Sequence, residues 1–307
     1  MRKGLLLRAV VALLILAFLV RVGPTVGAAA GDSFYVQNRQ PAAPDYVGTI
    51  TLYHIVTHRT YQGSVTAFLQ ERAEAFNKQH FGVRIAVEGM GEQDFVERLS
   101  YGRRADMYSF FSGALYEELL QAATFAPEAS LRPGLAVTSY AAPWFFSGYV
   151  QVSEGETAPI IALANGAAGV VLDLRAWGDL QRSGEGRGEA SFAGLFTDQV
   201  CYLGVDRNTS PERAEWCLKF YDFLLSEPVQ RMLPALGAFS VRTDTPCPYG
   251  DGLLVKLDRS YEAVTVPDPF RYHVHRTKLR EEAEAALKGD EAAKNNFFQR
   301  LAIVIGP

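Results

Sequence analysis

The hydrophobic pattern is most regular in the first half of the chain. An apolar run over 49–56 and a period-two alternation over 83–89 predict two strands, and an apolar run over 105–111 predicts a third. Helical patterns separate the strands, a long one after the first strand and a short one around 95–99. This order predicts an α/β fold with a parallel-rich sheet.

The long helix has clear boundary signals. Ser64 can cap its start and Gly82 can end it. One face carries the apolar positions Val65, Phe68, Leu69, Ala73 and Phe76. Because ligands of such sheets bind beyond the carboxyl ends of the strands, we expect a site among the loops 57–64, 89–94 and 109–113.

The rest of the chain is less regular. The further predicted elements are an extended aromatic segment over 140–152, a buried strand over 169–172, a glycine-rich loop over 181–194, a strand over 199–205, a helix opened by Ser210 and Pro211, a proline-containing loop region over 242–272, and helices over 277–288 and 290–303.

The N-terminus has the order of an export signal. Basic residues precede an apolar run over 9–20, and small residues follow at 27–30. The run is shorter than the ~20 residues that a spanning helix prefers. We therefore predict that residues 1–30 are a signal peptide, with an uncleaved membrane anchor as the alternative, and that residues 31–48 are a linker.

Composition narrows the possible functions. The 307 residues are 48% hydrophobic and 21% charged, with a net charge of −4. Proteins that bind nucleic acid concentrate Lys and Arg, so nucleic acid is not an expected partner. The three cysteines, Cys201, Cys217 and Cys247, allow one disulfide in an oxidising compartment, or three free thiols.

Motifs for catalysis or metal binding are weak. His273 and His275 share one face only if "RYHVHR" is a strand, and they lack a third ligand. His54 and His58 are four apart but span a strand end, and "GEGRGE" lacks the ending of a phosphate loop. No nucleophile motif is present, so we expect no enzyme activity, no metal and no cofactor.

Two segments resemble a known family. "ERAEWCLKFYDFLLSEPVQRMLPALGAFSVR" is similar to the late segment of sugar-type extracellular solute-binding proteins of ABC transporters, with Ser240 where proline is usual. The matching positions there are Ser226, Gln230, Gly237, Phe239 and Val241. The segment 50–113 resembles the family's beginning, with matches at Phe76, His80, Val83, Val87, Phe95, Leu99, Gly102 and Asp106.

The resemblance implies a two-lobed, hinged α/β protein that closes around a small solute. Residues 49–125 with part of the C-terminal region would form lobe 1. Residues 126–240 would form mainly lobe 2 with the hinge crossings, shortened over about 121–159. Residues 241–307 would be C-terminal helices.

Candidate ligand-binding residues follow the predicted strands. His58, Arg59 and Tyr61 offer a donor, a charge and a stacking face. The others are Phe111, Ser112, Trp144, Asp173 and Trp177. The alternative interpretation of these residues is that they lie in solvated loops or pack in the core.

The resemblance implies a monomeric extracytoplasmic protein that binds a small polar solute, carbohydrate-like by preference, for an ABC permease in the membrane. One alternative is a sensory or protein-interaction subunit on the same fold. Another is a binder of anions or metal chelates that uses hydroxyls such as those of Thr57, Ser64 and Ser112.

Overall fold

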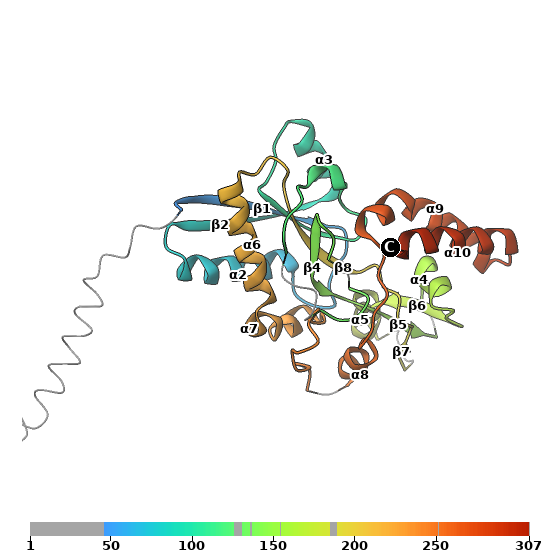
Figure 1. Ribbon diagram of the computed structural model, residues 1–307. Helices are drawn as coiled ribbons and strands as arrows, with labels where there is room; N and C mark the ends of the chain where they lie inside the picture. Colours follow the sequence, from blue (N-terminus) through green and yellow to red (C-terminus); the bar gives the residue numbers. More distant parts are fainter. Residues whose placement is uncertain are drawn as a thin grey trace, which may run out of the picture. The chain divides into compact units, whose positions relative to one another are not determined.

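The computed structural model describes residues 46–125, 131–135, 137–153, 155–184, 189–250 and 252–306 (Figure 1). The predicted export signal and most of the linker lie outside these residues. Within the described ranges, no helix is long and apolar enough to cross a membrane.

The larger sheet has five strands in the order β2-β1-β3-β8-β4. These strands are β1 (Gly48–Val56), β2 (Val83–Gly91), β3 (Met107–Phe111), β4 (Ala141–Phe146) and β8 (Val200–Val205). The strands β2 and β3 run parallel to β1, as expected. However, β8 is antiparallel to both β3 and β4, so the sheet is mixed. The chain leaves this sheet after β4 and returns through β8, which lies between β3 and β4.

The smaller sheet is formed by the chain between β4 and β8. Its strands are antiparallel, in the order β6-β5-β7: β5 (Tyr149–Val152), β6 (Val170–Asp173) and β7 (Ser191–Phe192). The helices α4 (Pro159–Ala164) and α5 (Leu174–Ser183) accompany it. Asp173 caps α5 by accepting a hydrogen bond from Ala176 N at 2.6 Å.

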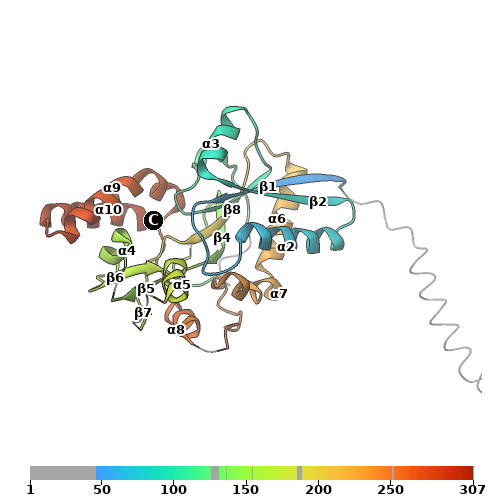
Figure 2. The ribbon, with the colours of Figure 1, turned by 180° about the vertical axis from the view of Figure 1, so that it is seen from behind.

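Helices cover the larger sheet as the apolar stripes predict. They are α2 (Val65–Gln79), α3 (Glu92–Ser100), α6 (Pro211–Leu225) and α7 (Glu227–Gln230), with short 3-10 turns at Glu117–Leu119 and Leu233–Leu236. Figure 2 shows α2 and α6 beside β1 and β2. Phe76 of α2 packs edge-on against Phe220 and Phe223 of α6, with ring centroids 5.3 and 5.5 Å apart.

The prediction of a loop region over 242–272 is wrong in part. The helix α8 (Leu253–Ser260) lies within it, and α9 (Pro269–Leu287) begins before its end. Prolines suggested a break, but Pro269 occupies the first turn of α9, where no backbone donor is needed, and Asp268 caps the helix. The helices α9 and α10 (Glu291–Ile305) lie side by side (Figures 1 and 2).

The segment "RYHVHR" is therefore helical rather than extended. His273 Nδ1 contacts the carbonyl of Gly113, and His275 Nδ1 lies 3.4 Å from Arg300 Nη1. Neither His belongs to a metal-binding group within the described residues.

Two adjacent crossings, the segments from β4 to β5 and from β7 to β8, carry the chain between the two sheets. Ser147 N donates to Gln199 O at 2.8 Å, and Thr197 Oγ1 donates to Ser147 O at 2.8 Å. Beside them, the phenols of Tyr149 and Tyr272 each donate to the buried carboxylate of Asp198 at 2.5 Å. The hinge that the resemblance implies is expected at these two short segments.

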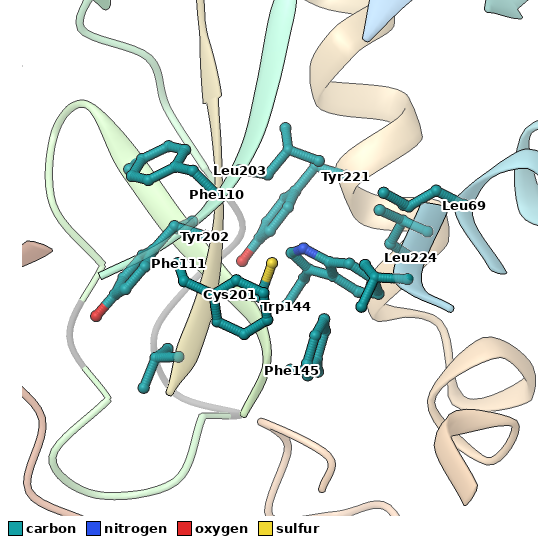
Figure 3. Packing of buried hydrophobic residues seen from close by; sticks show 14 of the residues in the cluster. Leu69, Phe110, Phe111, Trp144, Phe145, Cys201, Tyr202, Leu203, Tyr221 and Leu224 are labelled. Atoms are coloured by element: carbon teal, nitrogen blue, oxygen red, sulfur yellow. The ribbon is translucent and has the colours of Figure 1, made fainter. Parts of the chain in front are cut away.

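The main core surrounds β4 and β8 (Figure 3). Trp144 is 0% exposed and stacks on Phe68 of α2, with ring centroids 6.1 Å apart. All three cysteines are free, so the structure contains no disulfide between them. Burial raises the pKa of Cys201 to about 12, which makes this thiol unreactive.

Candidate functional site

A cavity of about 220 Å³ lies at the carboxyl end of β1. Its lining comes from the end of β1, the loop that follows, the first turn of α2, and α5. The lining residues are His54, Val56, residues 58–60, residues 63–66 and Arg175. Elements that accompany both sheets therefore contribute to one cavity.

Tyr61 ties the β1–α2 loop to α5. Its ring stacks on Trp177 of α5, with centroids 5.9 Å apart and an interplanar angle of 21°. Glycines allow this approach, because a Cβ at Gly178 or Gly237 would lie 2.8 or 2.7 Å from Tyr61 atoms. Gly237 also has a φ of +63°, which disfavours other residues.

The same loop is held by the turn before Gly237. Gln62 N donates to Leu236 O at 3.3 Å, and the Gln62 side-chain amide donates to Pro234 O. The "GAFSV" segment thus has a structural role. It supports the loop from one side, while Phe239 and Phe146 of β4 exchange two backbone hydrogen bonds.

His54 contributes a buried polar group to the cavity. Its side chain is 1% exposed, and its Nδ1 lies 3.0 Å from Ser109 Oγ on β3. Ser109 Oγ in turn lies 3.4 Å from Cys201 Sγ on β8. Burial lowers the pKa of His54 to about 4, so the imidazole is neutral near pH 7.

The charged side chains that line the cavity are all basic. Arg59 and Arg175 line it, and no Asp or Glu does. The N-terminus of α2 adds a partial positive charge, because its first N–H groups have no partners within the helix. The site is therefore electropositive and offers hydrogen-bond donors.

The structure brings together four of the predicted site residues. His58 and Arg59 line the cavity, and Tyr61 and Trp177 form the stacked pair at its edge. The ring of Phe111 lies 5.1 Å from that of His58, but Phe111 itself is buried.

The remaining predicted residues lie elsewhere. Trp144 is part of the core, because aromatic density at β4 reflects packing between the sheet and α2. Ser112 is buried beyond the end of β3. Asp173 caps α5 and lines a separate hollow of about 590 Å³ on the smaller sheet, together with Glu156, Leu180 and Ser183. We do not retain these three residues in the site.

Several cavity residues, His54 and Arg175 among them, were not predicted as ligands. His54 interrupts an apolar strand, and a polar residue at the end of a buried strand is a signal that could have identified it. Arg175 lies 116 positions after Arg59 in the sequence, and only the crossing between the sheets brings it to the cavity.

Comparisons with known proteins identify the fold. No protein-family profile matches this chain, and no curated protein is a detectable relative. The GacH receptor of Streptomyces glaucescens, solved unliganded and with acarbose, superposes with a TM-score of 0.56 at 14% identity, covering 84% of this chain and 99% of that one.

Two further solved structures have the same fold. The ABC substrate-binding protein Lmo0181 from Listeria monocytogenes, in complex with cycloalternan, gives a TM-score of 0.54 at 13% identity, covering 84% and 98% of the two chains. The Atu4243-GABA receptor gives 0.52 at 15% identity, covering 78% and 97%. The chain has the two-lobed α/β fold of ABC solute-binding proteins.

Proposed function

We propose that this chain binds a small polar solute outside the cytoplasm and delivers it, as a monomer, to an ABC importer. One observation carries the proposal: the cavity at the end of β1 is lined both by the β1–α2 loop and by Arg175 of α5. A solute held there contacts elements of both sheets. Binding without covalent chemistry is the role this arrangement supports.

The hinge explains how binding is signalled. A solute stabilises closure only through contacts that the open form lacks. Arg175 of α5 would supply such a contact to the solute, and the Tyr61–Trp177 stack holds α5 against the β1–α2 loop in the closed form. Opening at the two crossings would separate them, and the permease would then distinguish the loaded from the empty protein.

The cavity limits the size of the solute. A volume of about 220 Å³ is below the range of about 300–1,000 Å³ typical of sites for drug-sized ligands. The acarbose and cycloalternan complexes of similar structures support a carbohydrate-like solute. Among the described residues, however, the lining contains no Phe, Tyr or Trp, so the aromatic stacking expected for a sugar comes mainly from the Tyr61–Trp177 edge.

A solute panel tests the proposal. We would measure thermal unfolding of the purified full chain with monosaccharides, polyols, amino acids and oxyanions. A ligand that binds only the folded state raises the unfolding temperature. The proposal predicts stabilisation by one class, together with a change in tryptophan fluorescence.

Matched variants locate the response. Trp177→Phe should remove most of the fluorescence change, because Trp177 stacks across the cavity edge. Trp216→Phe should retain the fluorescence change, because Trp216 lies on α6 and packs against Phe76 and His80 at the end of α2, away from the cavity. A flat response to every class would contradict solute transport and favour the sensory or interaction subunit.

A further inference from the structure

The two arginines at the cavity have unused hydrogen-bonding capacity. Arg175 Nε donates to Asp179 Oδ2 at 3.2 Å, while its two terminal nitrogens have no partner among the described residues. Arg59 is an exposed residue that lines the same cavity, and it makes no ion pair within the described part of the chain. Two guanidinium groups thus border one small volume without a carboxylate between them.

The first turn of α2 adds backbone donors to the same volume. The helix begins after Ser64, and residues 63–66 line the cavity. Ser64 Oγ accepts from Ala67 N, which leaves the amides of Val65 and Thr66 without partners inside the helix. No acidic residue occupies this first turn, so no side chain of α2 compensates the helix dipole there.

His54 adds a polar side chain to the same cavity. It is 1% exposed and lines the cavity, and Ser109 occupies its Nδ1. Its Nε2 has no partner in the part of the chain that the structure describes. This nitrogen is available to hydrogen-bond a solute in the cavity.

We propose that the solute carries an anionic group, a carboxylate or a tetrahedral oxyanion, held between Arg59, Arg175 and the first turn of α2, with His54 Nε2 as a neutral contact. This inference rests on the proposed function, because it names the chemical class of solute for the same cavity. Guanidinium groups match both anions in geometry and bind them through paired hydrogen bonds. A helix N-terminus favours the same charge.

A neutral polyol satisfies this cavity less well. It would occupy the volume but supply no negative charge to Arg59 or to the N-terminus of α2, while Arg175 would keep only Asp179 as a carboxylate partner among the described residues. Partly desolvated charges without partners are costly, so closure over a neutral solute gains less free energy than closure over an anion.

Calorimetric titration of the full chain separates the classes. The probes are the sodium salts of acetate, malonate, sulfate and phosphate, with glucose and glycerol as neutral probes. We expect binding by at least one anion and weaker or no binding by the neutral probes. Carboxylates and oxyanions form separate arms, so the result also identifies which anionic group fits. Raising sodium chloride should weaken anion binding, because salt screens exposed charges.

Charge-removing variants test the assignment. Arg59→Gln and Arg175→Gln should each weaken anion binding by about tenfold or more, as expected when a charged hydrogen bond is lost. Arg182→Gln is the control for Arg175, because Arg182 lies on the same helix and pairs with the same Asp179, at 2.6 Å, but does not line the cavity. Arg103→Gln is an exposed-loop control for Arg59. Circular dichroism should show that all four variants fold.

The outcomes distinguish this inference from the function on which it rests. Anion binding that falls in both cavity variants and persists in both controls supports it. Neutral probes that bind more tightly than the anions, or anion binding unchanged in Arg59→Gln and Arg175→Gln, would overturn the inference and leave solute binding intact. No response to any probe, combined with a flat response to the solute panel, would overturn both.

Discussion

Two aromatic groups in this molecule differ in their surroundings. Trp144, Phe145 and Phe146 lie on one strand of the larger sheet, and all three are 0% exposed. Tyr61 and Trp177 come from a loop and a helix far apart in the sequence, and both are half-buried beside a cavity. The first group stabilises one sheet and its covering helix, whereas the second joins elements of the two sheets.

The difference shows why aromatic density is a poor guide to a binding site. Consecutive aromatic residues on β4 face both sides of a sheet that is covered on both, so all of them become core. The cavity, in contrast, is lined by polar and basic side chains that share no sequence pattern. Its recognition chemistry comes from charge and unpaired donors rather than from stacking faces.

Truncation of the two tryptophans should give the largest difference between the groups. Trp144→Ala removes a fully buried ring and should lower the free energy of unfolding by about 3–5 kcal/mol. Trp177→Ala removes one partner of a half-buried stack and should cost about 1 kcal/mol. Urea unfolding of both variants measures the costs. Equal losses of unfolding free energy in the two variants would contradict the distinction between the core aromatic group and the pair at the cavity edge.

The buried imidazole at the cavity floor should make stability depend on pH. His54 has a pKa near 4 in the folded chain and about 6.5 when unfolded. Between these values the unfolded chain binds a proton that the folded chain does not, so stability falls as the pH falls from 6.5 to 4. The loss attributable to His54 is about 3 kcal/mol.

His54→Gln isolates this contribution. We expect the variant to lose less stability than the wild type between pH 6.5 and 4, measured by urea unfolding at several pH values. The comparison variant is His80→Gln, at the end of α2 and away from the cavity: burial and Lys219 also lower the pKa of His80, but this side chain is partly exposed, so we expect a smaller change in the pH profile than His54→Gln gives. Identical pH profiles for His54→Gln and the wild type would show that His54 titrates normally and is accessible to water.

A glycine pair tests the support of the β1–α2 loop and should give the smallest effect. Gly237 and Gly102 both have positive φ values, +63° and +70°, but only Gly237 contacts Tyr61. Gly102→Ala should cost about 1 kcal/mol, from backbone strain alone. Gly237→Ala should cost about 2 kcal/mol and also weaken solute binding, because the new Cβ displaces Tyr61. Equal stability and equal affinity in the two variants would contradict the role of Tyr61.

Local sequence patterns predicted most of the elements of the larger sheet. The three N-terminal strands, α2 with its Ser64 cap, and α6 with Ser210 and Pro211 at its start lie where periodicity and capping indicate. These elements are determined by neighbouring residues. The rule that ligands bind beyond the carboxyl ends of parallel strands also indicated the loop over 57–64, where the cavity lies.

What the sequence could not provide depends on long-range contact. The antiparallel direction of β8 is set by its pairing with β3 and β4, which are distant in the sequence, and α8 was hidden by neighbouring prolines. Arg59 and Arg175 line the same cavity only because the chain passes twice between the sheets and because Tyr61 stacks on Trp177. No local pattern encodes these contacts.

The most direct test of the account is a crystal structure of the full chain with the solute that stabilises it most. The account predicts that the solute lies at the end of β1, within hydrogen-bond distance of the first turn of α2 and of both Arg59 and Arg175. A solute bound in the hollow beside Asp173 and Ser183, with the cavity at β1 occupied only by water, would contradict it.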